Sequence, residues 1–204
     1  MSLGLGHGRR ALAVLALGTA ALGLVTPGHA LPLVADRPRV QAIVVDAALA
    51  LGVDPALALA LAHAESAFDP KARSVKGARG VMQIMPATVR GEYALHPDVL
   101  WDPRINATIG LHFLRRLVDY YGSEPLALSY YNGGSAVGSR AEARIIPATR
   151  RYVDKVLRLR RQYAAELDRT DGLAGLLAQS DDAPARPVRA GSPSLASAAE
   201  PVGF

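Results

Sequence analysis

Apolar residues recur at three- and four-residue spacing along most of the chain, which is the period of amphipathic helices. Two Asp-Pro pairs, at 54–55 and 102–103, each supply an N-cap residue followed by a proline that fits the first helical turn. Gly52 and Gly122 follow apolar stripes and mark helix ends. The pattern predicts an all-α fold. The expected helices span residues 40–51, 55–68, 86–93, 103–121, 125–131 and 149–167.

One glutamate lies on an apolar stripe. Leu57, Leu61 and Glu65 follow one another at four-residue spacing, and Phe68 continues the stripe three residues later. A carboxyl group on this face is partly removed from water and lies near the negative end of the helix dipole, so its pKa should be raised. A carboxyl group that stays protonated can donate a proton to a leaving oxygen.

The alternative is a glutamate at the rim that forms an ion pair with a base of the following loop. Periodicity alone favours neither interpretation. The bases of that loop are Lys71, Arg73, Lys76 and Arg79. Gly77 and Gly80 allow the loop to turn tightly and to approach a ligand closely. Gln83 then lies within the apolar run 81–85, where a glutamine either caps backbone groups or hydrogen-bonds a ligand; considered alone, the backbone role is favoured.

The N-terminus has the features of a secretory signal peptide. Arg9 and Arg10 precede an apolar run at 11–25, and Gly28 and Ala30 form a small-residue cleavage site. The run is shorter than the roughly 20 apolar residues that a membrane-spanning helix needs, so a cleaved signal is favoured over an uncleaved anchor. We therefore expect a periplasmic or secreted protein with no stable membrane insertion after signal cleavage.

Composition and charge narrow the classes of function. The 204 residues include no cysteine, which excludes disulfides, thiolate metal sites and lipidated cysteine. The formal net charge of +5 becomes +3 without Arg9 and Arg10, because residues 1–30 contain no acidic residue. This mild basic excess in an exported protein does not indicate a nucleic-acid partner.

Composition also divides the chain into segments. We expect a signal peptide at 1–30, a proline-punctuated lead-in at 31–38 and one folded domain at 39–167. Gly, Ala, Ser, Pro and Asp dominate residues 168–204. This composition predicts a disordered tail, with a helical remnant near residues 173–179.

Five short motifs follow one another along the domain. They are Glu65-Ser66, Phe68-Asp69-Pro70, Gly80–Pro86 (GVMQIMP), Tyr130–Gly134 (YYNGG) and Thr149–Val153 (TRRYV). Each motif alone is unspecific, but five in this order, over roughly residues 39–161, resemble the catalytic domain of the soluble lytic transglycosylases. These enzymes are the lysozyme-like family that cleaves peptidoglycan. The resemblance implies a lysozyme-like helical domain with a deep substrate groove, and it makes residues 39–167 a lytic transglycosylase catalytic domain.

The resemblance also implies roles for individual residues. Glu65 corresponds to the single catalytic acid and base of the family. The residues that correspond to the family's substrate groove are Ser74, Gln83, Met85, Tyr131, Asn132 and Tyr152, the last of which matches a tyrosine that faces the glutamate. The chain departs from the family at two places. Residues 132–135 read Asn-Gly-Gly-Ser where Asn-Ala-Gly-Pro is usual, which changes Gly133 and Ser135, and Ala148 replaces a common glutamate. We expect the first departure to loosen the turn and the second to remove a charge near the groove. Neither affects the acid, so they bear on substrate preference more than on activity.

The mechanism implied by the resemblance needs no metal or organic cofactor. Glu65 protonates the oxygen between MurNAc and GlcNAc and then accepts the proton of the MurNAc C6 hydroxyl, which closes a 1,6-anhydro ring. The expected partners are peptidoglycan glycan strands, together with an envelope complex that the C-terminal tail contacts. Two alternatives stay open: a hydrolase of the same bond, and a non-catalytic glycan-binding or scaffold module of an envelope machine.

Overall fold

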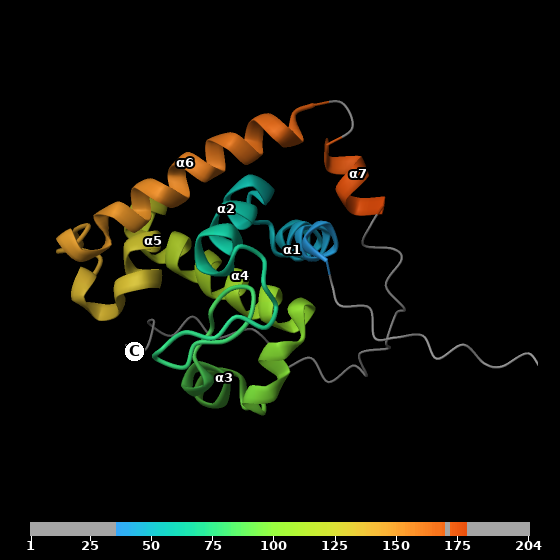
Figure 1. Cartoon of the computed structure of the whole chain (residues 1–204). Helices are drawn as coiled ribbons and strands as arrows, with labels where there is room; N and C mark the ends of the chain where they lie inside the picture. The colour runs from blue at the N-terminus through green and yellow to red at the C-terminus, as the bar shows by residue number, and fades with distance from the viewer. Residues whose placement is uncertain (1–35, 170–171, 179–204) are drawn as a thin grey trace, which may run out of the picture. The chain divides into compact units, whose positions relative to one another are not determined.

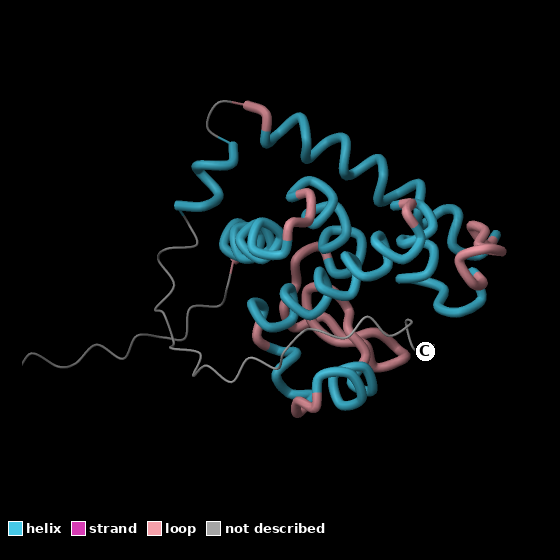
Figure 2. Tube along the Cα trace, turned by 180° about the vertical axis from the view of Figure 1, so that it is seen from behind, coloured by secondary structure: helices cyan, strands magenta, loops and turns pink. Residues whose placement is uncertain are grey.

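The computed structural model describes residues 36–169 and 172–178, all of which belong to one structural unit. Helices dominate it, and among the described residues the only β pairing consists of isolated bridges at Arg79 (Figures 1 and 2). The all-α prediction is confirmed. The α-helices are α1 (Arg37–Leu51), α2 (Pro55–Ser66), α3 (Pro86–Tyr93), α4 (Pro103–Tyr121), α5 (Glu124–Gly133), α6 (Arg150–Leu167) and α7 (Gly172–Ala178). Short 3-10 helices lie at η1 (Pro97–Trp101), η2 (Gly134–Val137) and η3 (Pro147–Thr149).

The helices begin where side chains cap them. Asp54 and Asp102 accept hydrogen bonds from the first turns of α2 and α4, as the Asp-Pro pairs predict. Several predicted boundaries differ from the structure. α2 ends at Ser66 instead of residue 68, because Ala67 and Phe68 adopt left-handed backbone angles, so Phe68 lies beyond the helix. α1 begins at Arg37 instead of residue 40, because Asp36 caps it and a proline fits its first turn, so the end of the predicted lead-in is helical. α5 continues to Gly133, which places Tyr131 and Asn132 in its last turn.

α2 lies at the centre of the domain, and all its residues from Ala56 to Ala62 are buried. α1 and α6 pack against it, and α4 packs against α1 and α5. Burial of each leucine of α2 contributes about 2 kcal/mol, so the helix that carries Glu65 is firmly held. No helix in the described part of the chain is long and apolar enough to cross a bilayer.

Arg160 of α6 joins three helices. Its Nε donates a hydrogen bond to Asp54 Oδ2 at 2.7 Å, and its Nη1 donates one to Glu124 Oε2 at 2.5 Å. Asp54 caps α2 and Glu124 begins α5, so a planar guanidinium fixes the position of α6 relative to both helices. This contact matters because α6 also carries Tyr152.

α7 falls at the helical remnant predicted near residues 173–179. Leu173, Leu176 and Leu177 share one face at three- and four-residue spacing and pack against the core, next to α1. The predicted signal peptide at 1–30 and the rest of the predicted tail, from residue 179, lie outside the described residues. The predicted domain limits therefore stay predictions.

Candidate active site

Glu65 lies in the last turn of α2, on the wall of an open groove. Burial raises its pKa from the ordinary 4.5 to about 7. Two neighbours act in the opposite direction: the Tyr152 hydroxyl donates a hydrogen bond to Oε1, and the Lys155 ammonium contributes a positive charge. Its pKa therefore lies near neutral pH, which allows the carboxyl group both to give and to accept a proton.

The ion pair considered as an alternative for Glu65 does not form. In the part of the chain that the structure describes, no salt bridge involves this carboxylate. Arg79 of the following loop pairs with Asp98 instead, at 2.9 Å. Lys155 donates its hydrogen bond to the carbonyl oxygen of Ala64, at 3.1 Å. The glutamate is therefore a desolvated group with a neutral hydroxyl partner.

The groove has a volume of about 550 Å³, within the range of small-molecule sites. α2, α3, α4 and α5 line it together with the loop between α2 and α3. A larger cavity of about 650 Å³ lies between α1, α2, α6 and α7, but no predicted site residue lines it and its carboxylate, Glu166, is exposed. The smaller groove is the better candidate. Its lining includes Glu65, Ser74, Gln83, Met85, Tyr131 and Asn132.

The chain turns sharply directly after Glu65. Ala67 and Phe68 have φ angles of 52° and 70°, which side chains larger than glycine rarely adopt, and Phe68 is only 2% exposed. Its ring packs in the core against His63 and Tyr163, and this burial offsets the backbone strain. Ser66 Oγ donates a hydrogen bond to the carbonyl oxygen of Val81 at 2.8 Å. The returning segment of the loop is therefore tied to α2 beside the glutamate.

Asn106 of α4 holds the other end of this loop. It is fully buried, and its Oδ1 accepts a hydrogen bond from the Met82 amide at 2.7 Å. Its Nδ2 donates to the carbonyl oxygens of Arg79, at 2.8 Å, and Leu100, at 3.0 Å. A single amide side chain thus satisfies three backbone groups that would otherwise be buried without partners. Asn106 was not among the predicted site residues; its one signal in the sequence is that of a polar residue beside an apolar stripe.

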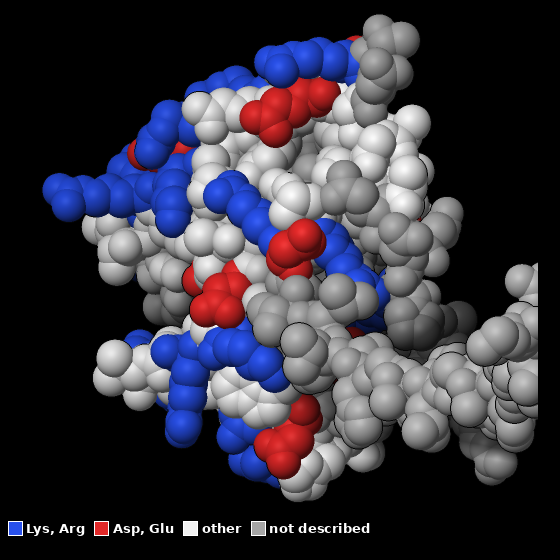
Figure 3. All heavy atoms as spheres, turned by 45° about the vertical axis from the view of Figure 1, so that its right-hand side comes forward, with Lys and Arg blue, Asp and Glu red and all other residues white. Residues whose placement is uncertain are grey.

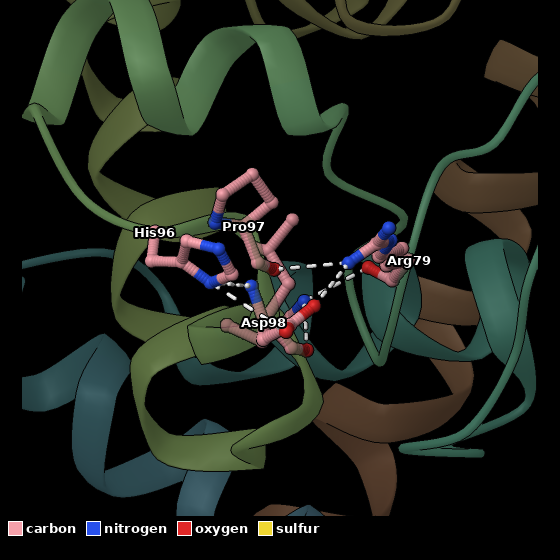
Figure 4. Close-up of polar contacts among 6 residues, drawn as sticks. Arg79, His96, Pro97 and Asp98 are labelled. Atoms are coloured by element: carbon pink, nitrogen blue, oxygen red, sulfur yellow. Dashed lines mark hydrogen bonds and ion pairs between the residues drawn. The ribbon is translucent and has the colours of Figure 1, made fainter.

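Arg79 fastens the loop to η1. Its Nη1 donates hydrogen bonds to Asp98 Oδ1 at 2.9 Å and to the Pro97 carbonyl oxygen at 3.4 Å, as Figure 4 shows. Its guanidinium also lies 5.2 Å from the centre of the Trp101 ring. His96 accepts a hydrogen bond from the Asp98 amide in the same cluster. Arg79 therefore has a structural role in positioning the groove wall.

Gln83 and Ser74 also hold the loop together. Gln83 Nε2 donates to the carbonyl oxygens of Ala72 at 3.2 Å and Gly80 at 2.9 Å, so both amide protons are used and Oε1 is left as an acceptor. The Ser74 hydroxyl accepts a hydrogen bond from the Ala78 amide at 2.9 Å, which leaves its own proton to donate. Gln83 therefore has the backbone role that was favoured for it and also lines the groove.

Two tyrosines complete the site. Tyr131 donates a hydrogen bond to the Met82 carbonyl oxygen at 2.9 Å, and burial raises its pKa well above 10. Tyr152 is presented from the start of α6 and also has a pKa well above 10, through burial and the nearby Glu65. A buried hydrogen bond of 2.6 Å between Ser129 and Thr149 fixes the start of α6 against α5. Both phenols are therefore neutral hydrogen-bond donors at physiological pH.

The Transglycosylase SLT domain family matches residues 43–145, which is just over half of the chain. The chain belongs to this family. Two curated relatives are similar over shorter segments. The transglycosylase of Enterobacteria phage PRD1 is 37% identical over 83 residues, or 41% of this chain and 30% of that protein. The soluble lytic murein transglycosylase of Escherichia coli (strain K12) is 36% identical over 85 residues, or 38% of this chain and 13% of that protein.

A solved structure extends the comparison to the fold. The lytic transglycosylase Slt of Pseudomonas aeruginosa, solved as an inactive glutamate-to-glutamine mutant, aligns with a TM-score of 0.55 at 26% identity. The alignment covers 65% of this chain and 25% of that one. The predicted lysozyme-like, all-α fold is therefore confirmed. The chain spans less than a third of the length of each of these three relatives.

Within this SLT domain, the structure brings all the predicted site residues together. Six line the groove, and Tyr152, which lies beyond the residues matched by the family, reaches Glu65 from α6. Lys76, Thr88 and Phe113 line the same groove and were not predicted. The roles of these residues in binding and catalysis stay predictions. So does the expectation of a cofactor-free reaction.

The departure at Gly133 has a structural reason in this SLT domain. A Cβ atom at this position would lie 2.7 Å from side-chain atoms of Ile146 and Thr149, which is too close for real contacts. Glycine therefore lets the segment before α6 pack directly on the end of α5. The expected loosening of the turn is offset by this contact, and Thr149 is kept within reach of Ser129.

Proposed function

We propose that this chain is a peptidoglycan lytic transglycosylase that cleaves the MurNAc-β-1,4-GlcNAc bond without water. The observation that carries the proposal is Glu65, which lines a groove, is hydrogen-bonded by Tyr152 and has its pKa raised to about 7. Membership of the SLT family and the similarity to known transglycosylases support the same reaction. Peptidoglycan glycan strands are then the substrate.

The reaction has two steps and one protein group acts in both. Glu65 first donates its proton to the bridging oxygen, the bond from that oxygen to MurNAc C1 breaks, and the GlcNAc 4-hydroxyl leaves. The N-acetyl carbonyl of MurNAc stabilises the electron-deficient C1. The C6 hydroxyl oxygen then bonds to C1, and its proton passes to the Glu65 carboxylate. The products are a 1,6-anhydro-MurNAc end and a regenerated acid, and no water is consumed.

The make-up of the groove supports a mechanism with a lone acid. Among the described residues that line it, Glu65 is the only one with a carboxyl group. Asp69, the nearest carboxylate in sequence, is exposed and accepts a hydrogen bond from the Lys71 amide at 2.8 Å. Most glycosidases use two carboxylates, whereas substrate-assisted enzymes need one because the substrate supplies the second group.

A hydrolase of the same bond is the second candidate, because water could take the place of the C6 hydroxyl in the second step. A non-catalytic glycan-binding or scaffold module is the third, and the partly buried glutamate with its raised pKa argues against it. The proposal places the enzyme in the periplasm or outside the cell, on the basis of the predicted signal peptide.

Digestion of purified sacculi, followed by mass analysis of the released muropeptides, tests all three functions. The transglycosylase releases products with 1,6-anhydro ends. A hydrolase releases reducing ends, which are heavier by one water. A binding module releases nothing while it still sediments with the sacculi. Reducing ends or no release would each overturn the proposal.

A further inference from the structure

α6 carries most of the excess positive charge of the described residues. These residues include 19 Lys or Arg and 14 Asp or Glu, a net charge of +5. α6 alone holds six bases and two acids, a net charge of +4. Its 18 residues form a rod about 27 Å long. The excess charge is therefore concentrated on one element.

Three of these bases form a stripe. Arg151, Lys155 and Arg158 follow at four- and three-residue spacing, which places them on one face of α6, and all three are exposed. We call these three residues the basic stripe; Arg150 and Arg161, also exposed, flank it. None of the five forms an ion pair with another described residue. Figure 3 shows Lys and Arg side chains along the edge of the surface that α6 forms.

The basic stripe begins at the groove. Lys155 donates its hydrogen bond to Ala64, the residue directly before Glu65, and Tyr152 of the preceding turn donates to Glu65 itself. Lys76, which is exposed, lines the groove from the loop between α2 and α3. The groove therefore has positive charge both on that loop and where α6 meets it, and on α6 the charge continues away from the catalytic carboxyl.

The stripe suits a ligand that is held by charge. The large apolar side chains that are exposed in the described residues are Leu49, Val75 and Leu95, and none of them lies on α6. A chain with repeated anionic groups would match bases spaced along a helix. Because Lys155 contacts the residue directly before Glu65, the stripe lies beside the groove, and that chain is best sought in the substrate itself.

We propose that the basic stripe binds the carboxylates of the peptides attached to MurNAc, on the glycan strand in the groove or on its neighbour. The proposal rests on the proposed function, since it takes peptidoglycan as the groove's substrate. α6 would then have two roles: it positions Tyr152 next to Glu65, and it binds peptide-bearing strands. An anionic bilayer would also be attracted by these charges, but it has no continuity with the groove.

Binding assays in a Glu65→Gln background test this, because binding is then measured without cleavage. The stripe variant adds Arg151→Gln and Arg158→Gln. The matched control adds Arg90→Gln and Arg140→Gln, two exposed bases outside α6 whose removal lowers the net charge equally. Each protein is titrated by calorimetry with soluble peptide-bearing glycan strands, with the same strands after an amidase has removed the peptides, and with anionic phospholipid vesicles.

The stripe variant should bind peptide-bearing strands about fivefold more weakly than the background protein, as expected for the loss of two exposed ion pairs. This difference in affinity should become smaller at high salt. The control should change by less than about twofold, and all three proteins should bind peptide-free strands equally. Equal affinity of stripe variant and control for peptide-bearing strands would overturn the inference. So would an equal loss on peptide-free strands, or a difference seen only with vesicles. If the background protein binds neither kind of strand, the proposed function itself fails.

Discussion

Among single residues, Glu65 offers the most direct test of the mechanism. Glu65→Gln keeps the size of the side chain but can neither give nor accept the proton. General acid–base assistance is worth about 10²–10⁴-fold in each step, so cleavage of sacculi should become undetectable while glycan binding persists. The measurement is the yield of anhydro-muropeptides, with sedimentation on sacculi as the binding control. A variant that still cleaves would remove Glu65 from the mechanism.

The same substitution makes a prediction about stability. The pKa of Glu65 is about 7 in the fold against 4.5 in the reference state, so the folded protein holds this proton more tightly. The contribution of this group to the free energy of unfolding is fully present below pH 4.5 and is lost as pH rises from 4.5 through 7. Above pH 7 the charged form lowers the free energy of unfolding by at most about 3 kcal/mol. The melting temperature of Glu65→Gln, relative to the parent, should therefore rise between pH 4.5 and 7 and then level off. A relative decrease would indicate that the carboxylate is stabilising.

Tyr152 sets the pH range of the reaction. Its hydrogen bond lowers the pKa of Glu65 against the larger effect of burial, so Tyr152→Phe should raise that pKa. The loss of cleavage at alkaline pH should then move to higher pH, and the maximal rate should fall about tenfold, because the carboxylate formed after proton donation loses a partner. The measurement is muropeptide release from pH 5 to 9. Tyr163→Phe, on the same helix but bonded to His63, should leave the profile unchanged.

At the scale of the element, the loop between α2 and α3 depends on Arg79. Arg79→Ala removes the hydrogen bonds to Pro97 and Asp98 and the contact with the Trp101 ring, all in η1. It should lower the free energy of unfolding by about 1–2 kcal/mol. Because the loop carries Ser74 and Gln83, KM should rise more than kcat falls. Arg73→Ala is the matched control, since Arg73 is exposed and meets Arg79 only as a backbone bridge. Equal effects of the two substitutions would show that loss of charge, not anchoring, is responsible.

The elements also show what the sequence could and could not predict. Helix starts at Asp54 and Asp102 were predictable because a cap acts on amides two or three residues away. The burial of Glu65 followed from a stripe within one helix. The place of Asn106 beside an apolar stripe marks it as a buried polar residue, but its role was not predictable, since its partner Met82 is 24 residues away and only the folded loop brings the two together. Nor could spacing choose between Asp98 and Glu65 as the partner of Arg79, because that choice is made by tertiary structure.

At the scale of the whole molecule, the family match and the structure divide the domain differently. The match ends at residue 145, yet α6 supplies the hydroxyl group that contacts Glu65, and Arg160 joins it to α2 and α5. Residues 150–167 therefore belong to the same structural unit as the matched segment, in agreement with the motif at Thr149–Val153. Whether that unit ends at α6 or includes α7 depends on how much α7 stabilises the fold.

Two truncations locate this limit. Deletion of residues 179–204 should leave the melting temperature unchanged, since the composition of this segment predicts little apolar burial. Deletion of residues 168–204 also removes α7, whose Leu173, Leu176 and Leu177 are half-buried against the core. Three half-buried leucines contribute about 2–3 kcal/mol, so this deletion should lower the melting temperature by about 4–10 °C. Muropeptide release below that temperature should be unaffected, because no residue of α7 lines the groove. Equal melting temperatures would place the domain boundary at residue 167, as composition predicts, and lost cleavage would mean that α7 supports the site.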